Sequence, residues 1–488
     1  VWVRKLKKKQ NKKILIISNI ILGIYLLISL FLLGIIIKLS VLPLKYILII
    51  LPIYIIFTLL FGFLTIKKNI KSGIKIFIDV ILSILIIIYS SGLIYLNKTL
   101  NFMDKIKAKD YQTEEYYVIV LKDSDYDNVN QIKEIGIYES NDNYKNALEE
   151  LHKKIDFTEK KYNNYTNAVN NLLNKKVEAV FISSSHKSIL EEQLDFDKIK
   201  IIDTTEIKIK NDVKIEDIDV TKESFNIYIS GIDIYGNISQ VSRSDVNMIA
   251  TINPRTHEIL LTSIPRDYYV RLHGTTGYKD KLTHAGLYGI NMSIETLEDL
   301  FEIEIDYYVR VNFTTLVNLV DAIGGVDITS DKAFTARTNG SCTYVKGKNH
   351  LDGKCALAFS RERYAYSEGD RHRVQNQQAV ITAILNKALS SSTLVKKYSS
   401  ILESMGSSFQ TNMPQDKIYS LVNMQLDSMP KWNITSISVN GKDSSNYTYS
   451  YSAGKLYVME PDMSTVVNTT NKIKELENKW KKLFIQYY

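Results

Sequence analysis

Three long apolar stretches in the first hundred residues constrain the fold of this chain more than any other feature. They run from Ile14 to Ile37, from Val41 to Ile66 and from Ile74 to Leu96. Each stretch is long enough to cross a hydrocarbon layer roughly 30 Å thick as a helix that rises about 1.5 Å per residue. The sequence therefore predicts three transmembrane helices within residues 14–96, preceded by a basic tail over residues 1–13.

The basic residues around these stretches predict the orientation of the chain. Seven lysines and arginines precede the first stretch and four lie at the junction of the second and third (Lys67, Lys68, Lys71 and Lys75), whereas only two lie at the junction of the first and second (Lys38 and Lys45). Cytoplasmic segments carry the excess of positive charge, so the N-terminus and the second loop are expected in the cytoplasm. Three spans then place everything after about Asn97 outside the cell, in a multi-pass protein of the cell membrane that has the lipid bilayer as a partner.

The net charge has a different meaning once the membrane segment is set aside. The first hundred residues hold fourteen basic residues and one acidic residue, so they carry +13 and the remaining 388 residues carry −5 of the total of +8. The positive total therefore reflects membrane topology. We expect no nucleic-acid partner, because the exported part is mildly acidic and the sequence has no helix-turn-helix or zinc-finger spacing.

The exported part divides into two predicted α/β domains. After a short polar connector (98–113), residues 114–210 alternate strand-like and helical patterns, which predicts a small α/β domain. This domain has no arginine and no glycine-rich loop, so a structural or ligand-sensing accessory role is expected. A polar linker precedes a second domain at 224–390, in which a central sheet is expected to be flanked by helices. Residues 391–488 are expected to extend that domain.

Arginine is concentrated in the second domain. Ten of the eleven arginines lie between Arg243 and Arg373, in a chain that also has fifty lysines. The planar fork of an arginine grips a phosphate through two parallel hydrogen bonds, and a lysine cannot replace it in that geometry. This window therefore predicts a site that handles phosphate.

Aspartates accompany the arginines at the predicted strand ends. Asp233 follows the first strand of the second domain, Arg243 and Asp245 precede the second strand, and Arg266 and Asp267 follow the third. Open α/β sheets place their ligand crevice at strand ends. Asp233 and Asp245 suit Mg²⁺ or Mn²⁺, since Mg²⁺ takes one or two carboxylates together with phosphate oxygens. The alternative is that these aspartates cap turns.

A second charged cluster precedes a helix predicted to begin near Gln375. In an extended segment Arg361 and Arg363 share one face, and two neighbouring guanidiniums repel each other unless an anion lies between them. The alternative is a surface of salt bridges that includes Glu362. His372 is expected to be exposed, and four other arginines are expected to be solvated: Arg255, Arg271, Arg310 and Arg337.

Cys342 and Cys355 both fall in the exported part, where disulfides persist. A bond between them would enclose twelve residues and would stabilise the fold by about 3 kcal/mol in the chain-entropy model. The sequence leaves open whether the two thiols are paired. A metal site is not indicated, because no second cysteine pair accompanies them.

Seven short motifs resemble, in order, those of the LytR-CpsA-Psr family. They are Gly231-Ile232-Asp233, Arg243-Ser244-Asp245, Pro265-Arg266-Asp267, Lys281-Leu282-Thr283-His284-Ala285, Gly324-Gly325-Val326, Arg361-Glu362-Arg363, and Asp370-Arg371-His372-Arg373 followed by Gln377. The resemblance covers about Phe225 to Leu389. Three spans followed by an accessory domain look most like the CpsA-type, capsule-associated branch. The chain departs from the pattern at His372 and Asn376, where many members have glycine and a second arginine.

The resemblance implies a membrane-anchored phosphotransferase. Such an enzyme moves a glycopolymer, for example a capsular polysaccharide or a teichoic acid, from undecaprenyl pyrophosphate to a hydroxyl of peptidoglycan. By the same resemblance Asp233 and Asp245 would hold Mg²⁺. Asp267 and Asp370 are equal candidates for the base that accepts the proton of the acceptor, and the alternative for either is to orient a neighbouring arginine. Lys281 is as compatible with a structural role as with ligand contact. The residues implied to bind the pyrophosphate are Arg243, Arg266, Arg361, Arg363, Arg373 and Gln377.

Two other functions are compatible with parts of the sequence. A hydrolase could use the same residues with water as the acceptor, because only the acceptor differs. A membrane-bound transcriptional attenuator is the second alternative, and the expected position of the arginines outside the membrane argues against it.

Overall fold

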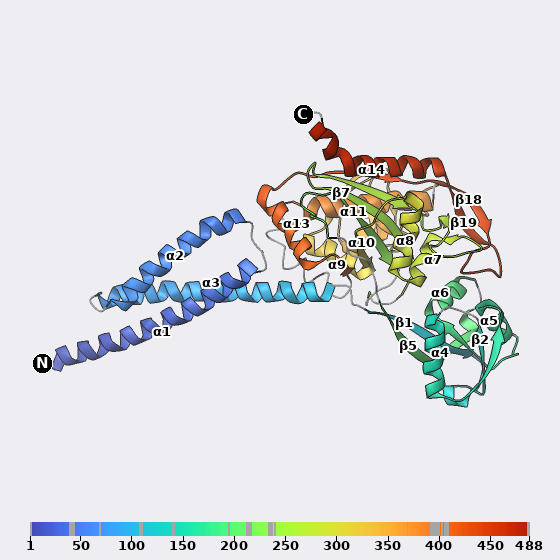
Figure 1. The fold of residues 1–488 in the computed structure, drawn as a ribbon, viewed down its shortest axis with the longest axis horizontal. Helices are drawn as coiled ribbons and strands as arrows, with labels where there is room; N and C mark the ends of the chain where they lie inside the picture. Colours follow the sequence, from blue (N-terminus) through green and yellow to red (C-terminus); the bar gives the residue numbers. More distant parts are fainter. Residues whose placement is uncertain are drawn as a thin grey trace.

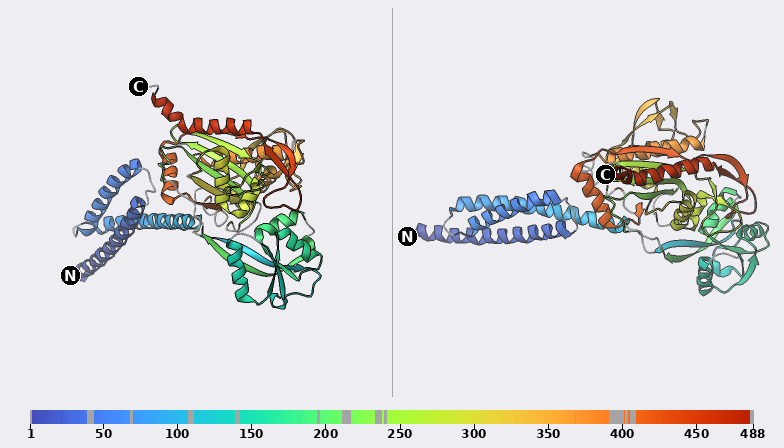
Figure 2. Two further views of the ribbon diagram at one scale, coloured as in Figure 1. Left: turned by 45° about the vertical axis from the view of Figure 1, so that its right-hand side comes forward. Right: turned by 45° about the horizontal axis from the view of Figure 1, so that its top comes forward.

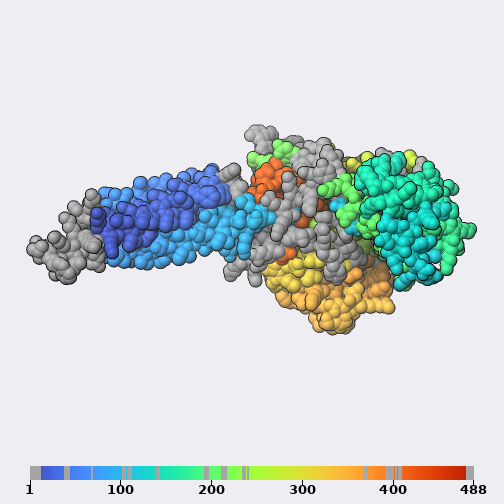
Figure 3. All heavy atoms as spheres, turned by 90° about the horizontal axis from the view of Figure 1, so that it is seen from below, coloured from blue at the N-terminus to red at the C-terminus, as the bar shows by residue number. Residues whose placement is uncertain are grey.

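The protein is described by a computed structural model, in which two α/β domains follow three long helices (Figure 1). The three helices and the first domain lie at opposite ends of an elongated molecule, as Figure 3 shows from below. The described residues are 2–38, 44–67, 70–106, 111–138, 142–193, 196–210, 217–232, 238, 241–367, 369–390, 401, 404 and 409–485.

The long helices are α1 (Trp2–Lys38), α2 (Leu44–Ile66) and α3 (Ser72–Ile106). All three are long and apolar enough to cross a membrane. Polar contacts join them: Ser18 Oγ donates to Asp79 Oδ2 at 2.7 Å, and the hydroxyls of Tyr25 and Thr58 lie 3.0 Å apart. Side-chain hydrogen bonds of this kind hold helices together where hydrophobic association is weak. The predicted connector at 98–113 differs from the structure, because α3 continues to Ile106 and residues 111–113 belong to a strand.

Residues 111–210 form the accessory domain, beside the second domain in both views of Figure 2. Its described strands form a sheet in the order β3-β2-β4-β1-β5, in which β1 is antiparallel to β4 and β5, and β2 is parallel to β3 and β4. The elements are β1 (Tyr111–Leu121), β2 (Glu134–Tyr138), α4 (Asp142–Lys154), β3 (Thr158–Tyr162), α5 (Tyr165–Leu173), β4 (Ala179–Ser183), α6 (Ser184–Gln193) and β5 (Ile199–Lys210).

The main domain, residues 217–485, is built on a mixed sheet in the order β16-β11-β6-β7-β8-β17. Strands β6, β7 and β8 form an antiparallel meander, and β11 and β17 run parallel to β6 and β8. The strands are β6 (Phe225–Ile232), β7 (Ser244–Asn253), β8 (Glu258–Ile264), β11 (Tyr307–Asn312), β16 (Phe409–Thr411) and β17 (Asn433–Ser438).

The C-terminal segment completes this sheet, where the sequence predicted an extension. Strands β16 and β17 lie beyond residue 390 and occupy the two edges of the described sheet. An uncovered edge strand exposes unpaired N–H and C=O groups, so the meander and β11 need these two strands. The described residues after 409 are therefore part of the domain itself.

Helices cover both faces of the sheet. On one face, α8 (Ile290–Phe301) and α14 (Met463–Ile485) bury apolar residues against Tyr228 and Ile249. On the other, Ile381 and Leu385 of α11 (Asp370–Ala388) pack on Met248. Helices α9 (Phe313–Ile323) and α10 (Gly353–Arg361) pack beside α11.

The boundaries of α9 follow the local chemistry of the residues at its two ends. The side chain of Asn312 accepts a hydrogen bond from the N–H of Thr315 at 3.0 Å, as an N-cap does. The helix ends at Gly324, whose φ of +85° favours glycine.

Shorter elements connect these layers. They are β9 (Tyr269–Val270), β10 (Asp280–Lys281), α7 (Leu282–Ala285), β12 (Val326–Ser330), β13 (Phe334–Thr335), β14 (Thr343–Tyr344), β15 (Gly347–Leu351), α13 (Gln415–Ser428), β18 (Gly441–Asn446) and β19 (Leu456–Pro461). The two domains share apolar packing, because Leu287, Tyr451 and Leu456 of the main domain belong to the core of the accessory domain.

Candidate active site

A cavity of about 350 Å³ lies at one edge of the main sheet, where β6, β8 and β11 end and β7 begins. We refer to it as the arginine-lined cavity. Its polar lining consists of Asp245, Arg266, Thr338, Ser360, Arg361, Arg363, Tyr364, Arg373 and Gln377, with Asn312. Its apolar lining consists of Ile232, Val246, Val311, Phe313, Leu316 and Leu357, with Gly231.

A β-bulge places Asp245 at this cavity. Gly231 pairs with Val246 and Ile232 pairs with Ser244, so Asp245 is the extra residue between them. Such a bulge bends the strand and redirects a side chain. A Cβ on Gly231 would lie 2.8 Å from Cβ of Val246, so glycine is required where the two strands approach.

Asp245 is held in an electropositive environment. Its side chain is 16% exposed, and Arg266 Nη1 donates to its Oδ1 and Oδ2 at 3.2 and 3.1 Å. Thr283 Oγ1 donates to Oδ1 at 3.2 Å. Burial raises the pKa of Asp245, but the charges of Arg266, Arg243 and Arg373 outweigh it and hold the pKa below the usual range. The carboxylate is therefore anionic at neutral pH.

Asp267 contacts Arg266 from outside the cavity lining, and Lys281 contacts Asp267. Asp267 Oδ2 lies 3.4 Å from Arg266 Nε, and its Oδ1 lies 3.1 Å from Lys281 Nζ. Both Asp267 and Lys281 are buried, and neither is among the described residues that line the cavity. This geometry suits Asp267 to orienting Arg266, which is one of the two roles that the sequence left open.

Arg361 and Arg363 reach the cavity from the end of a helix. The two arginines are expected on one face only if the segment is extended, and the structure differs because Arg361 is the last residue of α10. The Arg361 guanidinium lies 4.3 Å from the ring centroid of Phe313, and that of Arg363 lies 4.8 Å from the ring centroid of Tyr364. Stacking on an aromatic face holds each planar cation at the cavity wall.

Glu362 fixes the turn between these two arginines, although a surface salt bridge was the alternative expected for it. It is 1% exposed. Its Oε1 accepts hydrogen bonds from the main-chain N–H groups of residues 363, 364 and 365 at 3.0, 2.7 and 3.1 Å. Its Oε2 accepts a hydrogen bond from the main-chain N–H of Arg337 at 2.8 Å. Burial raises the pKa of Glu362, and these four hydrogen bonds outweigh it, so the pKa is lowered.

Helix α11 supplies the remaining side chains. Arg373 and Gln377 lie one turn apart near its N-terminal end and line the cavity. Arg243 contributes to the field at Asp245 without lining the cavity. Asp370 begins α11, and its side chain is outside the described part of the structure. Asp233 also lies outside the described residues.

Two residues that the sequence predicted to be exposed are buried. The ring of His372 stacks on Tyr366, with centroids 3.4 Å apart and an interplanar angle of 17°. Arg310 is 4% exposed, and its Nη1 donates to the carbonyl of Ile238 at 3.0 Å. Burial lowers the pKa of Arg310 to about 10. The period of two along β11 places Arg310 on the same buried face as Tyr308, and this signal could have revealed it.

The chemistry of Asp245 fits a shared metal site. Among the described residues there is no group of three or more His, Cys, Asp or Glu side chains that could hold a metal alone. Mg²⁺ needs only one or two protein carboxylates when phosphate oxygens complete its coordination. An anionic Asp245 at the cavity wall can supply one of these ligands.

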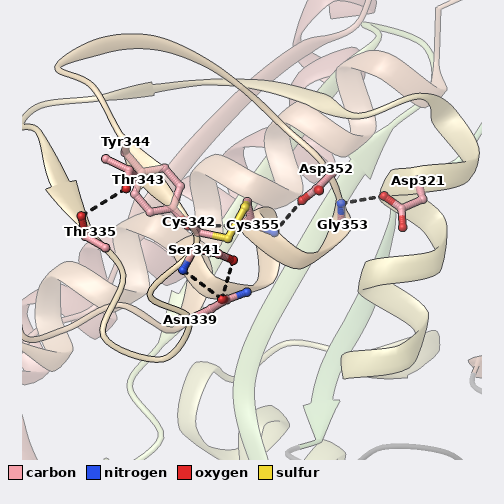
Figure 4. The surroundings of a disulfide bond; sticks show 10 residues. All are labelled: Asp321, Thr335, Asn339, Ser341, Cys342, Thr343, Tyr344, Asp352, Gly353 and Cys355. Carbon is pink, nitrogen blue, oxygen red and sulfur yellow. Dashed lines mark hydrogen bonds between the residues drawn. A yellow bond between two sulfur atoms is a disulfide. The ribbon is translucent and has the colours of Figure 1, made fainter.

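A disulfide braces the helix that carries Arg361. Cys342 and Cys355 are bonded, with Cα atoms 5.4 Å apart, which decides the question that the sequence left open. Figure 4 shows the bond linking the loop before β14 to α10. Tyr344 donates to the carbonyl of Cys355 at 2.7 Å and adds a second link.

Comparison with known proteins identifies the family. The model of the LytR-CpsA-Psr family matches residues 194–472, which is more than half of the chain. The chain belongs to this family. The match extends through β16 and β17 to α14, so the LytR-CpsA-Psr domain includes the segment that completes the sheet.

Several relatives within the LytR-CpsA-Psr family have established names. The chain is 35% identical over 227 residues to the polyisoprenyl-teichoic acid–peptidoglycan teichoic acid transferase TagU of Bacillus mycoides, covering 46% of this chain and 72% of the relative. It is 34% identical over 227 residues to TagU of Oceanobacillus iheyensis, covering 45% and 68%. A crystal structure of B. subtilis TagT aligns with 27% identity and a TM-score of 0.43, covering 54% of this chain and 95% of that one.

Proposed function

We propose that this protein transfers a glycopolymer from undecaprenyl pyrophosphate to peptidoglycan and forms a phosphodiester link. The observation that carries the proposal is the amphiphilic arginine-lined cavity. Four arginines form part of its wall, and aliphatic and aromatic side chains form another part. This division matches a ligand that has a pyrophosphate at one end and a polyprenyl chain at the other. The names of the TagU relatives support a teichoic-acid-like polymer, and a capsular polysaccharide is the other polymer that we propose.

The proposed reaction is a displacement at phosphorus. A hydroxyl oxygen of peptidoglycan attacks the phosphorus that carries the glycopolymer, and the bond from this phosphorus to the bridging oxygen breaks. Undecaprenyl phosphate leaves with the electron pair, and the proton of the hydroxyl passes to a carboxylate. Positioning and charge neutralisation supply most of the catalysis in reactions of this type.

The charged residues of the cavity and Gln377 have proposed parts in this reaction. Arg361, Arg363 and Arg373, together with Arg266, bind the phosphate oxygens through bidentate hydrogen bonds, and Gln377 orients the head group. Asp245, with Asp233 as the second candidate, would hold Mg²⁺. When bound, Mg²⁺ would neutralise charge on the pyrophosphate.

The supporting residues have less direct parts. Asp267 is engaged with Arg266 and Lys281, so we assign it to positioning, and Asp370 is the candidate base. Arg243 adds to the positive potential at Asp245.

We also propose that the accessory and main domains lie outside the cell and that the N-terminus is cytoplasmic. The distribution of basic residues supports this orientation. A contact supports it further, because Lys45 Nζ at the start of α2 lies 2.9 Å from Asp427 Oδ1 of α13. This contact supports placing the start of α2 on the same side of the membrane as the main domain.

The test uses the full chain in lipid nanodiscs with a polyprenyl-pyrophosphate-linked oligosaccharide that carries a fluorescent sugar. We expect Mg²⁺-dependent release of polyprenyl phosphate that EDTA stops, and we expect Asp245→Ala and Arg266→Ala to abolish it. Arg255→Ala is the matched control, because this arginine lies outside the cavity. Undiminished activity in Asp245→Ala and Arg266→Ala would overturn the site.

The same assay separates transfer from hydrolysis. With purified peptidoglycan present, a transferase attaches the fluorescent sugar to the insoluble wall polymer. If the label instead appears only as a soluble phosphorylated oligosaccharide, water is the acceptor and the hydrolase alternative is correct.

A further inference from the structure

A second cavity, of about 640 Å³, lies between the accessory domain and the main domain. We refer to it as the tyrosine-lined cavity. The proposed transfer reaction gives it no part. Its described lining comprises Tyr116, Tyr138, Tyr165, Tyr288 and Tyr449, the polar residues Glu114, Asn143, Asn164, Ser183, Ser185, His186, Ser450 and Ser452, and Ile209, Val241, Leu287, Gly289 and Met292.

The aromatic side chains of this cavity are held by hydrogen bonds and by stacking. The hydroxyl of Tyr138 lies 2.8 Å from Nδ1 of His186. The His186 ring stacks on Tyr165, with centroids 4.1 Å apart and an interplanar angle of 8°. Tyr288 and Tyr449 meet edge to face at 6.0 Å. The cavity therefore presents aromatic surface in a fixed arrangement.

The charges around the cavity exclude two classes of ligand. The described lining contains neither lysine nor arginine, so it offers no cation to a phosphate or carboxylate. It contains one carboxyl group, that of Glu114, which is 7% exposed. Burial raises the pKa of Glu114 to about 7, although hydrogen bonds from Tyr116 and Asn143 oppose this shift. A single carboxyl that is partly protonated near neutral pH is a poor site for a divalent cation.

We propose that the tyrosine-lined cavity binds a pyranose sugar unit. A sugar ring presents C–H groups on its faces, which pack on aromatic rings, and hydroxyls at its edge, which pair with hydroxyl, amide and carboxyl groups. The lining supplies both kinds of contact, and the cavity volume lies within the range of about 300–1,000 Å³ that is usual for small-ligand sites. The proposal rests on the proposed function, since the sugar would belong to the donor polymer or to the peptidoglycan acceptor.

A chain of contacts joins this cavity to the arginine-lined cavity. Tyr165 of the accessory domain donates to the carbonyl of Ser450, and the N–H of Ser450 donates to Asp280 at 2.8 Å. Asp280 precedes Lys281, whose Nζ lies 3.1 Å from Asp267. A sugar that packs on Tyr165 would therefore contact a residue that is linked, through Ser450, Asp280, Lys281 and Asp267, to Arg266.

Saturation-transfer NMR on the full chain in nanodiscs tests the proposal with two probes. N,N′-diacetylchitobiose represents a neutral sugar pair, and the N-acetylglucosamine–N-acetylmuramic acid disaccharide represents the acceptor strand. We expect transfer from protein to at least one probe, weakened at least tenfold in affinity by Tyr449→Ala and by Glu114→Gln. Binding of the muramyl disaccharide alone would identify the acceptor as the source of the sugar, and binding of both probes would identify a general site for N-acetylhexosamines.

Matched controls make the result specific. Tyr457→Ala removes a tyrosine that is 45% exposed, as Tyr449 is 44% exposed, but Tyr457 does not line the cavity. Glu115→Gln alters the next carboxyl along β1, which accepts a hydrogen bond from Tyr117 instead. Both controls should bind sugar as the wild type does, and so should Arg266→Ala, even if the transferase proposal fails. The proposal would be overturned if neither probe showed saturation transfer. It would also be overturned if Tyr449→Ala and Glu114→Gln bound the probes with unchanged affinity.

Discussion

Asp245, whose side chain is 16% exposed, and Glu114, which is 7% exposed, are carboxyl groups in two cavities of the same chain, and their pKa values are shifted in opposite directions. Burial raises the pKa of both. At Asp245 the three nearby arginines outweigh burial and lower the pKa, whereas at Glu114 no cation opposes it and the pKa rises to about 7. Burial alone therefore does not decide the charge of a carboxyl group, and the neighbouring side chains do.

The comparison extends to the ligand that each cavity suits. In the arginine-lined cavity, an anionic carboxylate and several guanidiniums match a phosphate with a metal ion. In the tyrosine-lined cavity, a largely uncharged wall matches a neutral polar molecule. The two sites are joined through Asp280 and Lys281.

The largest expected effect comes from a change that keeps the charge of the arginine-lined cavity and removes its geometry. Arg266→Lys retains the cation, but an ammonium cannot contact Asp245 and Asp267 as the guanidinium does. We expect the rate of polyprenyl phosphate release to fall roughly 100-fold to 1,000-fold. Initial rates in nanodiscs measure this, with Arg255→Lys as the control. A fall of less than threefold would mean that charge alone defines this cavity.

The next effect concerns the stability of the accessory domain. The pKa of Glu114 is raised in the folded state from 4.5 to about 7, so the folded state favours the protonated carboxyl. The stabilisation that this proton provides is complete below pH 4.5 and is lost as the pH rises through 7. The loss approaches about 3 kcal/mol.

Glu114→Gln should remove this pH dependence, because the amide does not titrate. Urea unfolding of wild type and variant, followed at pH 4.5, 6 and 8, measures the difference. Other groups such as Asp306 titrate in both proteins. The difference between the two proteins in the free energy of unfolding at each pH therefore isolates the effect of Glu114. Parallel pH profiles for the two proteins would contradict the assigned environment of Glu114.

The disulfide offers a perturbation that should act on one cavity only. Replacing both Cys342 and Cys355 by serine should lower the free energy of unfolding by about 2–3 kcal/mol, since the unfolded chain regains the entropy of the closed loop. The variant should also lose transferase rate, because α10 carries Arg361, while it should keep the affinity of the tyrosine-lined cavity for sugar.

Denaturant unfolding without reductant measures the stability of the serine variant. Dithiothreitol provides the control, because it should bring the wild type to the stability of the variant and leave the variant unchanged. An equal fall in the transferase rate and in the affinity for sugar would show that the disulfide supports the whole fold and not α10 alone.

The sequence predicted the arginine-lined cavity better than the tyrosine-lined cavity, for a physical reason. Arg243 to Gln377 lie in one domain, and strand ends and helix starts are marked by local signals such as the Asn312 cap. Glu114, His186, Tyr288 and Tyr449 come from two domains, and no spacing along the chain relates them. A site between domains depends on how their surfaces meet, which local patterns do not encode.

Within the main domain, the features that the sequence did not predict depend on how strands pair or on burial in the folded protein. The bulge at Asp245 exists only because β6 and β7 pair in one register. Arg310 is buried because β11 is an inner strand. The edges are β16 and β17, which lie in the segment predicted to be an extension of the domain. In the accessory domain, β3 (TEKKY) is an edge strand with a polar sequence, so it lacks the apolar alternation that reveals a strand.

The smallest expected effect tests what a tyrosine does in each cavity. In the arginine-lined cavity, Tyr364 is 56% exposed, and the guanidiniums of Arg337 and Arg363 lie 4.2 and 4.8 Å from its ring centroid. Its hydroxyl also accepts from Arg363 Nη2 at 2.8 Å. Tyr364→Leu keeps an apolar side chain but removes the aromatic face and the hydroxyl.

An exposed cation–π contact contributes about 0.5–1 kcal/mol, so we expect KM for the lipid-linked donor to rise roughly twofold to fivefold while kcat is unchanged. Tyr364→Phe, which keeps the face, should lie between wild type and Tyr364→Leu. A large fall in kcat would place Tyr364 against the reacting groups. The expected result would distinguish a tyrosine that holds an arginine from the tyrosines that we propose contact a sugar directly.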